Sequence, residues 1–144
     1  MAATEPLCHL FGINPVGIPL HESLILEVEL FTYICGELKE VYRARNKDYF
    51  SLMKVSINQE NAMLEAKFLS FIINDILMSD EYSLAGISCY TQIPEEVICD
   101  VASGKNTTPS LLVSQKMIDL HRKVRPDLYR EVVKKITTKY LASI

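Results

Sequence analysis

The sequence predicts an all-α fold, and three observations lead to this prediction. Apolar residues recur at spacings of three and four residues along most of the chain, which is the period of an amphipathic helix. No segment shows the strict alternation of a half-buried strand, and only 5 Gly and 6 Pro interrupt the 144 residues. Hydrophobic residues make up 49% and charged residues 23% of the chain, which excludes a disordered composition.

The first helix is expected after an irregular arm. Residues 1–21 contain three Pro and two Gly, and a helix should begin near Glu22 or Ser23. A stripe with spacings of 4, 3, 4, 3 and 4 follows, made of Leu24, Val28, Phe31, Cys35, Leu38 and Tyr42. Such a stripe needs a partner, which is either another helix of this chain or the same helix of a second chain. We therefore expect it in the seam against the helix at 58–78 or in a homodimer interface through Leu24, Val28, Phe31 and Leu38.

The second long helix is expected after a polar break at residues 43–48. Residues 49–57 fit either one more helical turn or a short strand. Asn58 is a plausible N-cap with Glu60 in the first turn, and the apolar residues up to Leu77 lie on most sides of this helix. It should therefore be central to the core, and residues 79–81 should end it.

Shorter helices are predicted at residues 83–90, 94–102, 110–123 and 126–141. Ser83 and Ser110 are suitable caps, and Pro94 is expected at the first helical position of its helix. Glu95 and Glu96 lie near the positive end of the same helix, and Gly104 can end it in the left-handed conformation.

Residues 82–110 show a capped helix, a tight turn and a second helix with fixed apolar positions. The positions are Ser83 (cap), Ile87 (inward), Ser88 (small), Ile93 (after the turn), Ile98 and Val101 (inward), Gly104 (helix end) and Pro109 (next helix). This pattern resembles the helix-turn-helix of lambda-repressor-like (Xre/Cro-type) DNA-binding domains. With the helix at 58–78 as leading helix, the resemblance covers about residues 58–124. Gln92 stands where the family usually has Gly, so we expect it in a strained or different conformation.

The resemblance implies a DNA-binding transcriptional regulator that acts as a dimer, because one recognition helix reads only a half-site. The domains would be a helical arm and oligomerisation region at 1–57 and a helix-turn-helix domain with a basic C-terminal helix at 58–144. The implied DNA-binding residues are Glu95, Glu96 and Cys99 for the bases and Lys105, Asn106, Thr107 and Lys116 for the phosphates. Carboxylates accept a hydrogen bond from cytosine N4 but are repelled by phosphates. Glu95 and Glu96 could instead only stabilise the start of their helix.

Charge is distributed unevenly along the chain. The net charge is −6 over residues 1–82, zero over 83–124 and +3 over 125–144. The segment 105–139 alone contains nine basic and three acidic residues. This run is either a solvated face or a surface for nucleic acid or an acidic partner. The overall charge of −3 excludes a globally basic, histone-like binder.

A second function fits the acidic recognition helix. The chain could be a non-enzymatic protein-interaction or scaffold module that keeps the helix-turn-helix fold without binding duplex DNA. We expect no enzyme and no cofactor, because no Gly-rich phosphate loop, HExxH or GxSxG occurs. His121, near Asp119 and Asp127, is expected on the surface, and Cys8, His9 and His21 lack metal-ligand spacing, so no metal is expected.

The sequence predicts a cytoplasmic protein. No apolar stretch reaches 18 residues, and no positive charge precedes an apolar segment at the N-terminus. The four Cys show no CxxC spacing and are expected as reduced, mostly buried thiols.

Overall fold

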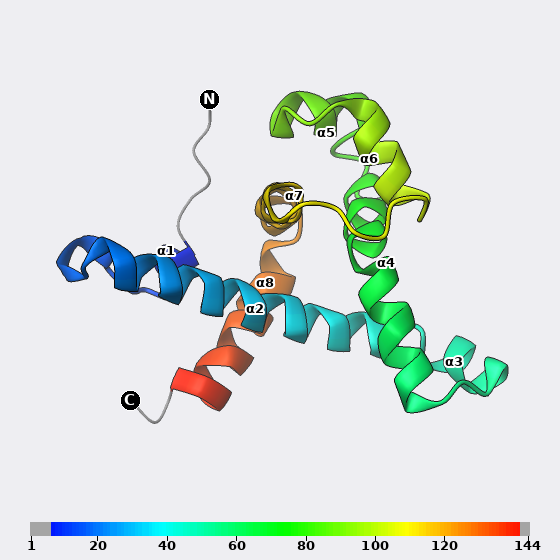
Figure 1. Cartoon of the computed structure of the whole chain (residues 1–144), viewed down its shortest axis with the longest axis horizontal. Coiled ribbons are helices and arrows are strands. Elements are labelled where there is room, and N and C mark those ends of the chain that lie inside the picture. The colour runs from blue at the N-terminus through cyan, green and yellow to red at the C-terminus, as the bar shows by residue number, and fades with distance from the viewer. Residues whose placement is uncertain (1–6, 142–144) are drawn as a thin grey trace. The chain divides into compact units, whose positions relative to one another are not determined.

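The computed structural model describes residues 7–141 and shows the all-α fold that the sequence predicts (Figure 1). The described residues form eight α-helices, a 3-10 turn and a π-helical turn, and no β-strand. The elements are α1 (Leu7–Leu10), η1 (Pro15–Gly17), α2 (Leu20–Arg45), α3 (Lys47–Met53), α4 (Ile57–Met78), α5 (Leu84–Thr91), α6 (Glu95–Ala102), α7 (Leu111–Val124), α8 (Pro126–Ile136) and η2 (Thr137–Leu141). No helix in this part of the chain is both long enough and apolar enough to cross a membrane.

The described residues group into two compact units. One contains residues up to Glu40 together with those from Pro126 onward, and the other runs from Val41 to Arg125. The boundaries therefore fall inside α2 and between α7 and α8. The domain division at residue 57 stays a prediction, and the connection between α3 and α4 lies inside the second unit.

The first unit joins α1, most of α2, α8 and η2. The backbone N–H groups of Leu7 and Cys8 donate to the Glu27 carboxylate at 2.7 and 2.8 Å, which satisfies two N–H groups at the start of α1. The rings of Tyr33 and Tyr140 stack with centroids 4.2 Å apart, which joins α2 to η2. The buried apolar side chains of this unit are Cys8, Leu30, Ile34, Leu38, Tyr129, Val132 and Ile136.

The first half of the predicted stripe of α2 is not buried within the chain, which contradicts the seam for these residues and leaves the homodimer interface a prediction. Leu24 and Val28 are 58% and 54% exposed, whereas Leu30 and Ile34 are fully buried. Leu38 is also fully buried inside the chain, so it cannot contribute to a homodimer interface. The reason is that residues 24–31 carry apolar side chains on more than one side of the helix, and two faces match the helical period equally well.

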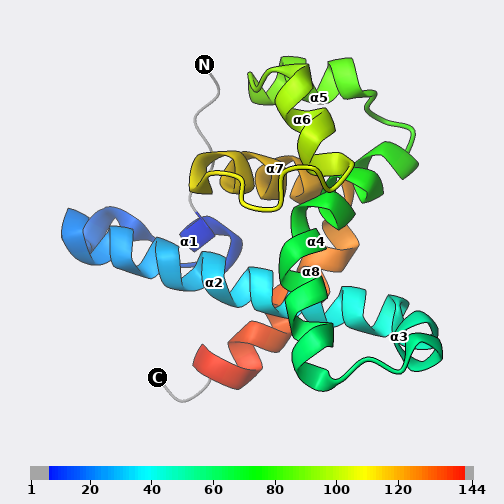
Figure 2. The ribbon, with the colours of Figure 1, turned by 45° about the vertical axis from the view of Figure 1, so that its right-hand side comes forward.

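The second unit is built around α4. Figures 1 and 2 both show α7 beside α4, with α5 and α6 at one end of it. Its buried core contains Leu64, Ile72, Ile73, Ile76, Ile87, Ile98, Val101, Met117, Ile118 and Leu120. The central position expected for the second long helix is therefore confirmed.

The start of α4 differs from the expectation. Ser56, not Asn58, is the N-cap, and its side chain accepts from the Gln59 N–H while the Gln59 side chain accepts from the Ser56 N–H. This reciprocal capping box satisfies two N–H groups at once. Of the ambiguous residues 49–57, the first five belong to α3, residues 54–56 are non-helical and residue 57 starts α4, so the segment is helical in part and forms no strand. The helix start is also earlier than expected in α2, which begins at Leu20 rather than at Glu22.

The cysteines are less buried than the composition suggested. None of the four forms a disulfide, and only Cys8 is buried, while Cys89 is exposed. Cys35 and Cys99 are partly exposed.

Candidate nucleic-acid interface

A tight turn connects α5 to α6. The Ser83 hydroxyl accepts from the Gly86 N–H at 3.0 Å and caps α5, as the sequence predicts. Gln92 ends α5 in the left-handed conformation with φ of 60°, and its N–H donates to the Ser88 carbonyl at 2.8 Å. Gln92 therefore has the strained conformation that the sequence led us to expect. A Gly at this position would adopt the same backbone conformation without steric cost.

Side-chain hydroxyls close this turn. The Thr91 hydroxyl donates to the Ile87 carbonyl at 2.7 Å and accepts from the Ile93 N–H at 3.3 Å. The Ser88 hydroxyl donates to the Ile93 carbonyl at 2.6 Å. The Thr91 carbonyl accepts from the Lys116 ammonium at 2.8 Å, which connects the turn to α7. These bonds satisfy polar groups that the crossing of the helices removes from water.

The inner face of α6 is fixed in the core. Ile98 and Val101 are buried, as are Ile87 and Ile93, which confirms these four inward positions. At the other end of α6, the Ser70 hydroxyl of α4 donates to the Ala102 carbonyl at 2.6 Å. That bond satisfies a carbonyl for which the helix itself provides no donor.

The outer face of α6 is acidic. Glu95 and Glu96 are exposed in its first turn, and Cys99 and Asp100 are partly exposed on the next turn. Pro94 is the N-cap rather than the first helical residue, so α6 begins at Glu95. Both carboxylates lie at the positive end of the helix, which stabilises them without any ligand.

The loop after α6 is held by its own backbone. Gly104 has φ of +83°, which confirms the left-handed conformation expected there. The Asn106 N–H donates to the Asp100 carbonyl at 2.8 Å, and the Asn106 side-chain carbonyl accepts from the Thr108 N–H at 3.0 Å. Lys105 and Thr107 are exposed, and Asn106 retains its side-chain N–H₂ as a donor group.

The structure places the predicted site residues in three locations. Glu95, Glu96 and Cys99 lie on the first two turns of α6, and Lys105, Asn106 and Thr107 lie beyond its other end. Eight residues of α-helix span about 12 Å, so the two groups are about one helix length apart. Lys116 lies at the turn before α6, bound to Thr91.

Most of the basic run makes polar contacts within the chain. At least five of its nine members do so: Lys116 with Thr91, Arg122 with Asp119, Arg125 with Asp75, Arg130 with Asp127 and Lys139 with Glu37. The Lys123 ammonium also lies 5.4 Å from the centre of the Tyr90 ring. The run is therefore not a continuous strip of lysines and arginines open to phosphate.

Sequence reasoning missed a cluster of charged side chains around the buried pair Asp75 and His121. His121 is fully buried rather than on the surface, and its Nε2 lies 2.7 Å from Oδ2 of Asp75, a residue that sequence reasoning had not paired with it. The Arg125 guanidinium lies 3.2 Å from the other carboxylate oxygen, and Arg45 lies 3.8 Å from it. The spacing of Met117, His121 and Val124 places the histidine on the apolar face of α7, and this signal could have indicated its burial.

Burial and pairing set the charge states in this cluster. Burial alone would raise the pKa of Asp75, but hydrogen bonds from His121 and Arg125 outweigh it and hold that pKa below its ordinary value. Burial lowers the pKa of His121, and the Asp75 carboxylate opposes this only in part. His121 is therefore neutral near pH 7 and donates from Nε2 to Asp75.

Neither a search for metal sites nor a comparison with known proteins assigns a function to these residues. Within residues 7–141, no three His, Cys, Asp or Glu side chains lie together so that they could hold a metal ion. No protein-family model, curated protein or solved structure matches the chain.

Proposed function

We propose that the chain binds duplex DNA through α6 and the loop that follows it, as a regulator of the helix-turn-helix type acting in the cytoplasm. The observation that supports this best is the fixed orientation of α6. Its apolar side is buried through Ile98 and Val101, and the hydroxyl-closed turn holds its start, so one exposed side remains. An exposed, rigidly held helix is the element that fits the major groove.

Each exposed group has a role that its chemistry allows. Glu95 and Glu96 accept hydrogen bonds from cytosine N4, and Cys99 contacts a base edge. Lys105, Thr107 and the Asn106 side-chain N–H₂ bind phosphate oxygens. Lys116 shares its ammonium, which has three donors, between Thr91 and a phosphate.

The regulator would act as a dimer, because a single α6 covers only one half-site. Leu24 and Val28 are exposed and Phe31 is partly exposed, so these three members of the expected interface remain accessible. They support self-association, whereas the buried Leu38 does not.

Fluorescence anisotropy on labelled duplexes tests the proposal. The parent should bind random duplex weakly at low salt, and the variant Glu95→Gln/Glu96→Gln should bind random duplex more tightly because two charges beside the phosphates are removed. The same variant should lose any preference for cytosine. The variant Asp48→Asn/Glu81→Gln makes the same charge change at two exposed positions outside α6 and serves as the control. No binding by the parent at micromolar protein and low salt would overturn the proposal.

A second candidate function is a protein-interaction module without duplex binding. The acidic outer face of α6 and the intrachain contacts of at least five of the nine basic residues favour it. This module would bind a basic protein surface through Glu95 and Glu96. It predicts that the double Gln variant loses partner binding, and that neither parent nor variant shifts duplex DNA.

A further inference from the structure

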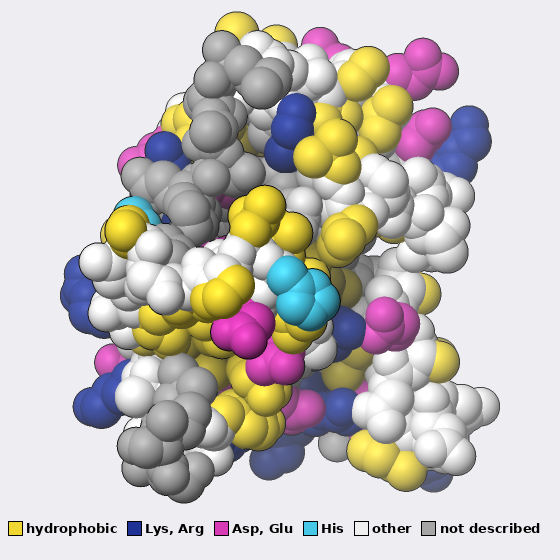
Figure 3. Space-filling view, turned by 60° about the vertical axis from the view of Figure 1, so that its left-hand side comes forward, with side chains coloured by type: hydrophobic (Ala, Val, Ile, Leu, Met, Phe, Trp, Pro, Cys, Tyr) yellow, Lys and Arg dark blue, Asp and Glu magenta, His cyan; other side chains and the backbone are white. Residues whose placement is uncertain are grey.

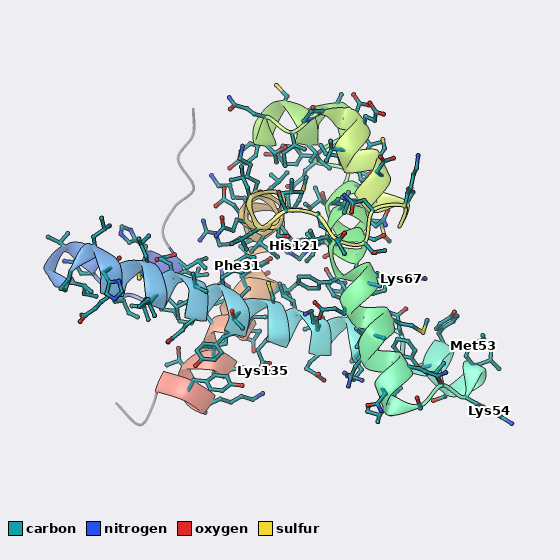
Figure 4. All side chains as sticks on the ribbon, in the orientation of Figure 1. Phe31, Met53, Lys54, Lys67, His121 and Lys135 are labelled. Carbon is teal, nitrogen blue, oxygen red and sulfur yellow. The ribbon has the colours of Figure 1, made fainter. Side chains whose placement is uncertain are left out.

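A small groove lies between α3 and α4 in the second unit. It has a volume of about 200 Å³ and is lined by Asn46, Tyr49, Phe50, Met63, Lys67 and Phe71. Phe50 is buried and forms part of an apolar floor, whereas Lys67 is exposed. In Figure 4, Met53 and Lys54 project from the end of α3 and Lys67 projects from the middle of α4.

The end of α3, which follows the lining residues Tyr49 and Phe50 in the sequence, is apolar and basic, and we call it the rim of the groove. Leu52 and Met53 are 79% and 55% exposed, and Tyr49 is exposed beside them. Residues 46–57 together with Lys67 contain three Lys and one Asp. Glu65, on α4, lines a different groove toward the 106–109 loop. An exposed apolar rim with excess positive charge suits an apolar and acidic partner.

The first half of α2 presents a surface of that kind. Leu20, Leu24, Ile25 and Val28 are exposed apolar residues at helical spacing, with Glu22 and Glu29 exposed beside them. The first 38 residues contain five Glu and no Lys or Arg. Figure 3 views the molecule from the side on which α2 begins, and hydrophobic side chains there lie next to acidic ones.

We propose that the start of α2 of one copy docks into the α3–α4 groove of a second copy. Leu24 and Val28 would cover the apolar rim, while Glu22 and Glu29 approach Lys54 and Lys67. Pairing of two α2 faces is less favourable, because it would bring carboxylates together with no basic side chain in that segment to offset them. The proposal rests on these surfaces and not on DNA binding.

Complementation between two variants tests the docking. The variant Leu24→Glu/Val28→Glu disrupts the apolar surface of α2, and the variant Leu52→Glu/Met53→Glu disrupts the apolar rim of the groove. All four residues are exposed, so little loss of folding stability is expected. Met78→Glu alters an equally exposed apolar residue outside both surfaces and is the control. Circular dichroism confirms that each variant is folded, and sedimentation velocity over the micromolar range measures association.

The parent and Met78→Glu should associate with increasing concentration, and each double variant alone should be monomeric, with Kd raised more than about tenfold. An equimolar mixture of the two double variants should form a 1:1 complex, since one intact α2 surface meets one intact groove. A parent that stays monomeric, or a mixture that forms no complex, would overturn the proposal. Continued self-association of the groove variant would also overturn it, and would indicate pairing through α2 alone.

Charge exchange provides an independent check. Glu22→Lys/Glu29→Lys and Lys54→Glu/Lys67→Glu should each weaken association several-fold, because like charges then face each other across the interface. All four changes in one chain should restore the parent value. No rescue in the combined variant would contradict the proposed pairing of these charges.

Discussion

His121 Nε2 lies 2.7 Å from Asp75 Oδ2, and the histidine side chain is fully buried. The bond connects α7 to α4, the two helices that form the centre of the second unit. A buried histidine held neutral has a direct consequence for stability, because the unfolded chain takes up its proton more readily than the folded chain.

Stability should fall in acid in two stages. The pKa of His121 lies below 6.5 in the folded chain, so stability declines as pH falls from about 6.5 toward that lower value. The pKa of Asp75 lies below 3.8, so its contribution is present above that pH and is lost as pH falls further. Urea unfolding of His121→Gln should show a flatter dependence of stability on pH in the range below 6.5 where the parent loses stability. His9→Gln, an exposed control, should follow the parent, and a parent-like slope in His121→Gln would contradict this account.

Ile98→Ala should destabilise the second unit by about 2–5 kcal/mol, because it leaves a cavity under α6. Val97→Ala, at the partly exposed neighbouring position, should cost less. Urea unfolding curves of both variants give the comparison. Equal effects would mean that α6 is rotated relative to the orientation described above.

Gln92→Gly should stabilise the chain by about 1 kcal/mol, because Gly adopts the left-handed conformation without the clash of a Cβ. Gln92→Val should destabilise it, since a β-branched residue is strained at φ of 60°. Thermal melts measure both changes. Equal melting temperatures for the Gly and Val variants would show that residue 92 is not left-handed.

The cysteines should differ in reactivity toward iodoacetamide. Burial raises the pKa of Cys8 to about 11, and the Glu27 carboxylate beside it adds to the shift. Cys89 is exposed and should be alkylated first, while Cys8 should react only after unfolding. Mass spectrometry of a time course resolves the sites, and denatured protein serves as the reference for full labelling. Early modification of Cys8 would contradict its burial.

Local signals in the sequence predicted much of the second unit. Ser83, Ser110 and Gly104 mark helix ends through side-chain caps or a left-handed backbone, and these depend on neighbours within a few residues. The inward positions of Ile87 and Ile98 follow from helical spacing and were also predictable. Ser56 could have been recognised as a cap, because Gln59 stands three residues later.

Long-range pairing was not predictable from spacing. His121 and Asp75 are 46 residues apart, and Lys139 and Glu37 are 102 residues apart, so no local pattern connects them. For this reason the basic segment 105–139 resembled a phosphate-binding surface in the sequence, although several of its Lys and Arg side chains pair with groups of the same chain. The buried side of α2 was ambiguous for a related reason, because Leu24 and Leu30 lie on different faces that both carry apolar residues.

Binding of duplex DNA as a function of salt tests the central proposal most directly. The logarithm of affinity should fall linearly with the logarithm of salt concentration, with a slope set by the number of phosphates contacted. Lys105→Ala should weaken binding to all sequences alike and reduce the slope by about 1. Lys47→Ala removes the same charge from exposed α3 and should leave the slope unchanged. No measurable binding of the parent at low salt, or equal slopes for the parent and both variants, would contradict DNA binding through the loop after α6.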